Sequence, residues 1–192
     1  MRKRQRSGRP VEAYHHGDLR QTLLNSALSQ IERSGPEAVS LAALARDLGV
    51  SQSAPYRHFE HRDQLLAALA AEGFRMFVAT LRKSTEGLSG KRAVAAMAKA
   101  YVAFGKARPG LYNLMFASGI VAGASDKDDV KIIARESFAV LVGALAPSRA
   151  RKLRALRIWT GLHGAVMLNR ENLLKSDIAD VSLDELVEDI VA

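Results

Sequence analysis

The sequence predicts an all-α protein, with an N-terminal three-helix unit joined to a C-terminal helical bundle and about nine helices in total. Apolar residues recur at three- and four-residue spacings along most of the 192 residues. No segment alternates between apolar and polar residues for long enough to indicate a strand. Glycine or proline follows several of the apolar stretches, where helices commonly end.

The first predicted helix runs from Leu19 to Ser34. Asp18 is expected to be its N-cap, with Gln21 three residues later as in a capping box. Gly35 and Pro36 are expected to end it, because glycine tolerates a positive φ and proline cannot continue a helix.

A possible helix-turn-helix follows at residues 40–59, which read SLAALARDLGVSQSAPYRHF. A short helix is predicted from Leu41 to Leu48 with Ser40 as its cap, and a glycine follows in the turn. Ser51 is expected to cap a second helix from Gln52 to His58. Two short helices joined in this way form a helix-turn-helix, whose second helix enters the major groove of DNA. An ordinary helical hairpin with a polar exposed face has the same pattern and stays an alternative on anatomy alone.

The rest of the chain is also predicted to be helical, with a loop expected at residues 119–125. Ser182 and Glu185 have the spacing of a capping box for the last helix. Composition changes near residues 75–90, but a predicted helix crosses this region, which argues against a flexible linker. The further predicted helices span residues 62–84, 91–107, 110–118, 126–145, 148–172 and 183–191.

The charge of the chain indicates a polyanionic partner. Its formal net charge is +8, and Arg2, Lys3, Arg4, Arg6 and Arg9 all precede the first acid, Glu12. Such a basic tail suits a nucleic acid or an anionic membrane surface, and a merely solubilising tail is the third possibility. The nearby pair His15 and His16 has no further ligands close in sequence, so an arm that approaches DNA is preferred to a metal site.

Several classes of protein are disfavoured by composition. The chain has no cysteine, which excludes disulfides, thiolate metal sites and a cysteine nucleophile. It shows no recognisable Ser-His-Asp context, phosphate-binding glycine loop or metal-ligand spacing, so neither an enzyme nor a cofactor or metal is expected. No apolar stretch is long enough to cross a membrane, and none follows the basic start as in a signal peptide. A cytoplasmic protein without a membrane partner is expected.

From Asp18 to about Phe77 the chain resembles the DNA-binding domain of the TetR family of transcriptional regulators. Arg62 stands where that family usually has lysine, and it keeps the positive charge. The resemblance implies a basic arm at 1–16, a DNA-binding domain at 17–77 and a ligand-binding and dimerisation domain at 78–192. The matching residues recur in order without gaps: Gly35, Pro36, Ser40, Leu41, Ala45, Leu48, Gly49, Val50, Ser51, Tyr56, Arg57, His58, Phe59, Leu65 and Leu66.

The resemblance implies a sequence-specific regulator that binds palindromic operator DNA as a homodimer, most commonly a repressor released by a small-molecule effector. It implies a phosphate clamp from Ser40, Tyr56 and Arg62. The residues implied to read bases are Gln52, Ser53 and Ala54, with Arg57 and His58 at bases or phosphates. A dimer is also required physically, because one recognition helix reads too few bases to be specific. It is expected to form through residues 148–172 and 183–191. The alternative is a helical protein that binds DNA or a partner non-specifically, without a ligand response.

Large side chains at helical spacings in residues 91–172 predict either core packing or a cavity between helices. In the second case Tyr101, Tyr112 and His163 are its polar groups, and His163 either contacts the ligand or is a structural hydrogen bonder. Gly161 and Gly164 lower helix propensity, which indicates close packing of another helix. The string Trp159-Thr-Gly-Leu-His163-Gly164 and residues 109–116 resemble a TetR subgroup with Trp, His and Gly on this helix. The candidate ligand-binding residues are Met97, Tyr101, Phe104, Tyr112, Met115, Phe116, Trp159, His163 and Met167.

Overall fold

The computed structural model describes residues 19–175, 177 and 179–192, and every regular element within them is helical. The predicted all-α class is therefore confirmed. The proposed cap Asp18 and the basic arm lie outside the described residues. The elements are α1 (Leu19–Ser34), the 3-10 helix η1 (Pro36–Ala38), α2 (Leu41–Asp47), the 3-10 helix η2 (Pro55–Arg57), α3 (Arg62–Ser84), α4 (Gly90–Ala107), α5 (Pro109–Phe116), α6 (Ile120–Gly123), α7 (Asp129–Ala144), α8 (Arg151–Arg170) and α9 (Leu183–Val191).

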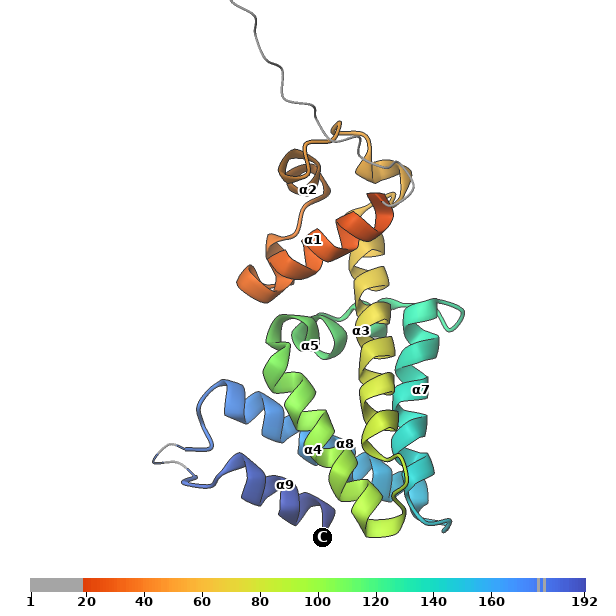
Figure 1. Cartoon of the computed structure of the whole chain (residues 1–192), viewed down its shortest axis with the longest axis vertical. Coiled ribbons are helices and arrows are strands. Elements are labelled where there is room, and N and C mark those ends of the chain that lie inside the picture. Colours follow the sequence, from red (N-terminus) through yellow and green to blue (C-terminus); the bar gives the residue numbers. More distant parts are fainter. Residues whose placement is uncertain (1–18, 176, 178) are drawn as a thin grey trace, which may run out of the picture.

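Helix α3 joins the two ends of the molecule. It runs from the small N-terminal helices into the bundle, with α7 alongside its lower part (Figure 1). Leu65 and Leu69 in its first half and Phe74, Phe77 and Leu81 in its second half belong to one hydrophobic core. By length and composition α3 would also suit a membrane span, but 56% of its apolar window is buried inside the protein. This burial is what the central helix of a packed core requires.

The N-terminal turns form as their sequence predicts. Gly35 has φ +79°, and its N–H donates to the Ile31 carbonyl at 2.9 Å, which ends α1. The hydroxyl of Ser40 accepts the N–H of Ala43 at 3.4 Å, so Ser40 is the N-cap of α2. Gly49, with φ +67°, then reverses the chain after α2. The predicted end of α1 and the cap of α2 are confirmed, and α1 begins at the first described residue, Leu19.

The second helix of the motif differs from its prediction. Gln52, Ser53 and Ala54 lie in a turn, and only Pro55–Arg57 is helical, as a 3-10 helix. Pro55 has no N–H to donate back to the preceding turn, so an α-helix from Gln52 is not completed. Instead the Ala54 N–H donates to the Ser51 carbonyl at 2.9 Å. The Ser51 hydroxyl pairs with the Ser53 hydroxyl at 3.4 Å rather than capping a helix.

The expected loop at residues 119–125 contains the short helix α6, so the sequence prediction was wrong there. Gly119 adopts the left-handed conformation before it, and the Ile120 N–H donates to the Ser118 hydroxyl at 3.3 Å. Ile120 and Val121 pack against the core, which stabilises the turn. Helices α7 and α8 each begin three residues later than predicted, at Asp129 and Arg151 rather than 126 and 148.

The last two helices pack against each other through small residues. A Cβ placed on Gly161 would lie 3.1 Å from the side chain of Ile190 on α9, so the predicted close approach is confirmed at this position. At Gly164 a Cβ would meet nothing within 4 Å, so no helix among the described residues packs closely on this glycine. Ser182 and Glu185 form the predicted capping box, with hydrogen bonds of 2.9 and 3.1 Å.

Helix α1 touches the bundle at the start of α5. The Glu32 carboxylate accepts the N–H of Gly110 at 3.0 Å and that of Leu111 at 3.2 Å. It thereby satisfies two free donors in the first turn of α5 and places a negative charge at the positive end of the helix. The contact is tight, because a Cβ on Gly110 would lie 2.4 Å from the Ile31 carbonyl oxygen.

Candidate nucleic-acid interface and candidate ligand cavity

The side chains predicted to contact DNA gather on one exposed surface around the helix-turn-helix. Of these residues, only Ala54 and Arg62 are half-buried, and Tyr56 is 50% exposed. Turn geometry rather than an α-helix therefore presents the proposed base-reading residues. The exposed members are Ser40, Gln52, Ser53, Tyr56, Arg57 and His58.

Two buried residues hold this surface in place. Pro55 is buried under the turn, and Phe59, 2% exposed, packs into the core with Leu65 and Leu66 as neighbours in the same cluster. The guanidinium of Arg20 on α1 lies 5.4 Å from the centre of the Phe59 ring, at a distance that suits a cation–π contact. The exposed residues between Pro55 and Phe59 are thus anchored at both ends.

Arg62 has a structural contact that the sequence did not indicate. Its Nε donates to the Val39 carbonyl at 2.9 Å, and its Nη2 donates to the Pro36 carbonyl at 2.5 Å. These bonds tie the start of α3 to the segment that leads into α2. A contact between Arg62 and a DNA phosphate stays a prediction, and the two carbonyls already use part of its donor set.

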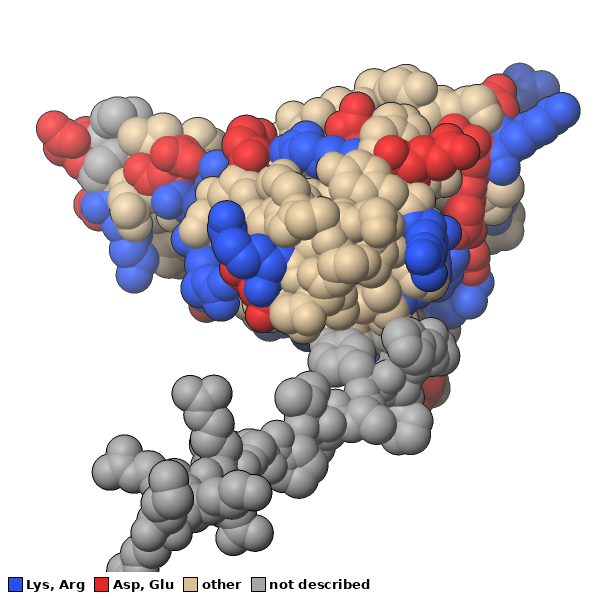
Figure 2. Space-filling model, turned by 90° about the horizontal axis from the view of Figure 1, so that it is seen from above, with Lys and Arg blue, Asp and Glu red and all other residues tan. Residues whose placement is uncertain are grey.

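The view from this end of the molecule shows basic side chains on both sides of an area without charged residues (Figure 2). This arrangement resembles what a groove-binding surface needs, with uncharged residues facing bases and cations facing the flanking phosphates. Residues 19–64 contain five arginines and five acids, so the described helix-turn-helix carries no formal net charge. The positive charge of the N-terminal end therefore lies in the basic arm.

A cavity of about 510 Å³ lies in the bundle between α3, α4, α5, α6, α7 and α8. Its size suits a small organic ligand. Six of the nine predicted ligand-binding residues line it: Met97, Tyr101, Met115, Phe116, Trp159 and His163. Phe104, Tyr112 and Met167 are not among its lining residues and pack in or against the core.

Sequence reasoning missed most of the walls from α3 and α7. Phe74, Phe77 and Leu81 on α3 belong to the hydrophobic core, and they also face the cavity. A helical spacing cannot tell these two environments apart. The α7 residues that line the cavity belong to no distinctive sequence motif. Two of them, Lys131 and Arg135, are basic residues four positions apart on one side of the helix. The remaining lining residues are Val121, Ala122, Ala134, Ser137, Phe138, Leu141 and Leu162.

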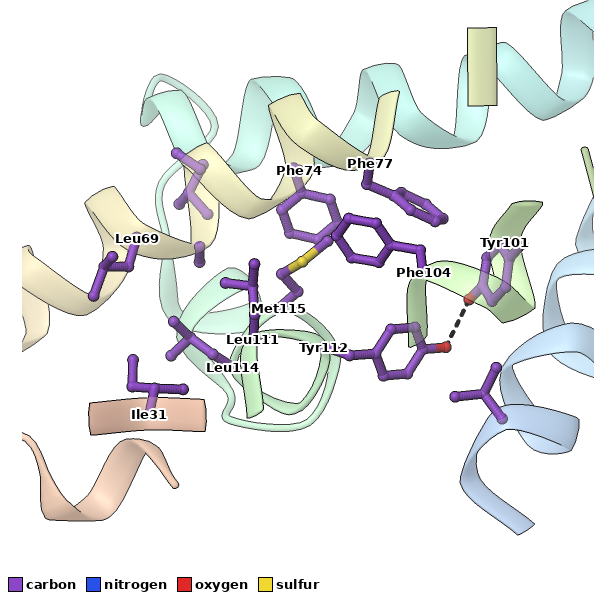
Figure 3. Close-up of a cluster of buried hydrophobic side chains, with 14 of the residues drawn as sticks. Ile31, Leu69, Phe74, Phe77, Tyr101, Phe104, Leu111, Tyr112, Leu114 and Met115 are labelled. Atoms are coloured by element: carbon purple, nitrogen blue, oxygen red, sulfur yellow. Dashed lines mark hydrogen bonds between the residues drawn. The ribbon is translucent and has the colours of Figure 1, made fainter. Parts of the chain in front are cut away.

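Aromatic rings from α3, α4 and α5 gather in the core next to the cavity, and Figure 3 shows five of them: Phe74, Phe77, Tyr101, Phe104 and Tyr112. Phe77 packs edge-on against Tyr101, with ring centres 5.0 Å apart, and Phe74 packs edge-on against Phe116 at 5.2 Å. Edge-to-face packing of this kind fixes ring orientations and adds to the stability gained by burial. Phe104, although outside the cavity lining, supports Phe77 from behind at 5.1 Å.

The polar groups of the cavity form a chain of hydrogen bonds. The hydroxyls of Tyr101 and Tyr112 lie 2.9 Å apart, as drawn in Figure 3, and the Tyr112 hydroxyl lies 2.7 Å from Nδ1 of His163. Burial raises the pKa of both phenols, so each stays protonated. Burial lowers the pKa of His163, which favours a neutral imidazole. Tyr112 therefore connects two cavity-lining residues from behind.

Two cations also line the cavity from α7, and both already have partners. The Lys131 ammonium donates to the Val121 carbonyl at 3.0 Å. The Arg135 guanidinium pairs with Asp126 at 2.5 Å. The other lining residues are uncharged or apolar, so the cavity combines an apolar interior with a few hydrogen-bonding groups.

Comparisons with known proteins agree with this architecture. The family model described as "Bacterial regulatory proteins, tetR family" matches residues 23–69, and the model "Tetracyclin repressor-like, C-terminal domain" matches residues 94–192. An uncharacterized HTH-type transcriptional regulator of Mycobacterium tuberculosis is 23% identical over 90% of this chain and 78% of its own length.

Solved structures with the same fold cover nearly the whole chain. A protein of unknown function from Rhodococcus sp. RHA1 is 31% identical, with a TM-score of 0.81 over 94% of this chain and 95% of its own. The transcriptional regulator FadR from Bacillus subtilis, solved with stearoyl-CoA, is 14% identical, with a TM-score of 0.67 over 89% of this chain and 95% of its own. The second likeness concerns the fold alone.

Proposed function

Because the chain belongs to the TetR family of transcriptional regulators, we propose that it represses transcription from a palindromic operator, which it binds as a homodimer and leaves when a small molecule enters the bundle cavity. The observation that supports this most directly is the pairing of an exposed helix-turn-helix surface with an apolar cavity, joined by α3. Catalysis has no part in the proposal, and the cytoplasm is the proposed location, where operator DNA is found.

DNA recognition is assigned to the exposed surface around η2. Gln52 and Ser53 at the turn, with Ala54 beneath them, are proposed to meet base edges in the major groove. Ser40, Tyr56 and Arg57 are proposed to contact phosphates, with His58 at either. Arg62 is proposed to act in two ways, through its remaining donors to a phosphate and through its bonds to Pro36 and Val39.

Dimerisation is assigned to α8 and α9. One side of α8 packs into the core, whereas the opposite side, which we call the open face of α8, is exposed or open. Leu153 on this face is 62% exposed and Leu168 is 43% exposed, and with the exposed Leu156 they form a row of apolar side chains that suits a partner helix. Gly164 lies between them with open space above it, so a second helix can approach closely. The open face consists of Leu153, Leu156, Thr160, Gly164 and Leu168, together with the exposed Arg157.

Release by a ligand is proposed as a shift between two arrangements of the dimer. A ligand in the cavity would favour a spacing of the two helix-turn-helix surfaces that no longer matches the half-sites. Helix α3 contributes Phe74 and Phe77 to the cavity and starts at the helix-turn-helix, so it is one route for this coupling. Trp159, His163 and Gly164 are proposed to place the chain in the subgroup with these residues on this helix.

The test is binding of the full chain to DNA from upstream of its own gene, measured by fluorescence anisotropy against a shuffled sequence over a salt series. We expect a preference of roughly 10³-fold or more for the upstream DNA, with two protomers per site. Gln52→Ala is expected to reduce this preference by about 10-fold, because a base contact is lost. Arg57→Ala is expected to weaken binding to both sequences alike and to lower the salt dependence, because a phosphate contact is lost.

Arg92→Ala is the control, since Arg92 is exposed near the start of α4, at the far end of the molecule from the helix-turn-helix. It should change neither affinity nor preference. Equal binding to both sequences, lost together as salt rises, would contradict operator recognition and favour the non-specific alternative.

A further inference from the structure

We propose that the cavity takes an uncharged, largely apolar molecule that accepts a hydrogen bond from the Nε2–H of His163. This inference rests on the proposed function, since it assumes that the cavity is the effector site. Its chemistry follows from the direction of the hydrogen-bond chain between Tyr101, Tyr112 and His163.

The hydrogen bonds can run in two directions, and only one gives both tyrosine hydroxyls an acceptor. In the first, Tyr101 donates to Tyr112, and Tyr112 donates to Nδ1 of His163. In the second, Nδ1–H donates to Tyr112, Tyr112 donates to Tyr101, and the hydroxyl hydrogen of Tyr101 has no acceptor among the described residues. Tyr101 is 3% exposed, and an unpaired buried donor costs about 1–3 kcal/mol.

A neighbour of Tyr101 favours the same direction. The indole N–H of Trp159 can only donate, and its proximity to the Tyr101 hydroxyl opposes the rise of the Tyr101 pKa. A donor beside the Tyr101 oxygen suits the arrangement in which the Tyr101 hydroxyl hydrogen points to Tyr112. The hydrogen bonds therefore run from Tyr101 on α4 through Tyr112 on α5 to His163 on α8.

This direction fixes the tautomer of His163. Nδ1 accepts from Tyr112, so the neutral ring carries its hydrogen on Nε2. Nε2 has no hydrogen-bond partner within residues 19–175, 177 and 179–192, and His163 is a half-buried lining residue of the cavity. The cavity thus offers a ligand one oriented N–H donor, for which a carbonyl or ring nitrogen is the matching group.

The rest of the lining favours a ligand without charge. The walls are mostly aromatic and aliphatic, and an ionised group there loses its hydration. The two charged lining residues, Lys131 and Arg135, are bound to the Val121 carbonyl and to Asp126. Their remaining donors are the alternative anchor for an anion, which the carboxylate probes below test directly.

The test uses matched probes that differ only in the acceptor. Acetophenone, α-methylstyrene and benzoate form one set, and 2-acetylnaphthalene, 2-isopropenylnaphthalene and 2-naphthoate form a larger set. Binding to the full chain is measured near neutral pH by calorimetry or ligand-observed NMR. In at least one set we expect the ketone to bind about 10-fold more tightly than both the isosteric hydrocarbon and the carboxylate.

Four variants separate the hydrogen bond from general packing. His163→Leu is expected to reduce the ratio of ketone affinity to hydrocarbon affinity to about one. His163→Gln keeps an N–H donor and is expected to retain a preference for the ketone. Tyr112 is a positioning residue, so Tyr112→Phe should lower the ratio and change the ¹⁵N NMR signals of His163. Tyr101→Phe removes a donor to Tyr112 only and should leave the His163 tautomer unchanged. Thermal melting and DNA binding verify that each variant is folded.

Several results would contradict the inference about the ligand. Equal binding of ketone and hydrocarbon in both sets, tightest binding of a carboxylate, failure of both ketones to bind, or a His163 signal of the Nδ1–H tautomer would each overturn the inference. Operator binding is measured on the same samples. If operator recognition is normal but the ketone and the hydrocarbon bind equally well, the inference about the ligand is wrong and the proposed function stands. If the ratio is as expected and operator DNA is not recognised, the proposed function fails while the cavity chemistry stands.

Discussion

Gly110→Ala is expected to lose about 3 kcal/mol of unfolding free energy and most operator affinity. A Cβ at this position would lie 2.4 Å from the Ile31 carbonyl oxygen and 2.9 Å from the Glu32 Cα. Both are backbone atoms, so no side-chain rotation relieves the clash, and α1 and α5 must separate. The separation would also lengthen the bonds from Gly110 and Leu111 to the Glu32 carboxylate. Urea unfolding followed by circular dichroism measures the loss.

Gly143→Ala is the matched control. Gly143 is also helical, on α7, and a Cβ there would meet nothing within 4 Å. Alanine should therefore stabilise the protein by about 0.5–1 kcal/mol, since it lowers the entropy of the unfolded chain. If Gly110→Ala unfolds at the same urea concentration as the wild type, the close contact between α1 and α5 is not a feature of the protein in solution.

The double variant Leu153→Asp with Leu168→Asp is expected to be monomeric and to bind operator DNA at least about 100-fold more weakly than the wild type. A carboxylate at each end of the open face of α8 would be buried against a partner helix, where it is unfavourable. A monomer engages one half-site, so the gain from binding two linked half-sites is lost. Sedimentation velocity gives the oligomeric state, and anisotropy gives the affinity.

Ile132→Asp is the control for the dimer prediction. Ile132 is 53% exposed on α7, so the change from an exposed aliphatic side chain to a carboxylate is the same. It should leave the dimer and its operator affinity unchanged. A double variant on α8 that still sediments as a dimer would contradict the assignment of the interface to this face.

The sequence predicted those parts of the fold that depend on local chemistry. The end of α1, the cap of α2 at Ser40 and the capping box of Ser182 and Glu185 follow from residues within a few positions of each other. The second helix of the motif was too long because the missing N–H of Pro55 was given too little weight. The helix α6 was missed because the packing of Ile120 and Val121 on distant core residues is not a local property.

The candidate cavity was predicted only in part for the same reason. Tyr101, Trp159 and His163 were identified by residue type, since large side chains with polar atoms suit a binding site. Phe77 and Ala134 carry no such signal, and only the packing of α3 against α7 brings them to the cavity. The bonds of Arg62 to Pro36 and Val39 cross more than 20 residues of chain, and no spacing rule indicates them.

Trp159 gives the protein a built-in optical reporter. It is the only tryptophan in the chain and lines the cavity, within 6.4 Å of the His163 ring centre and 6.0 Å of Phe138. Fluorescence excited at the red edge of protein absorption therefore comes from Trp159 in the cavity wall. No label is needed, and no second indole contributes to the signal. A compound library can be screened by this signal for occupants of the cavity before any operator sequence is known.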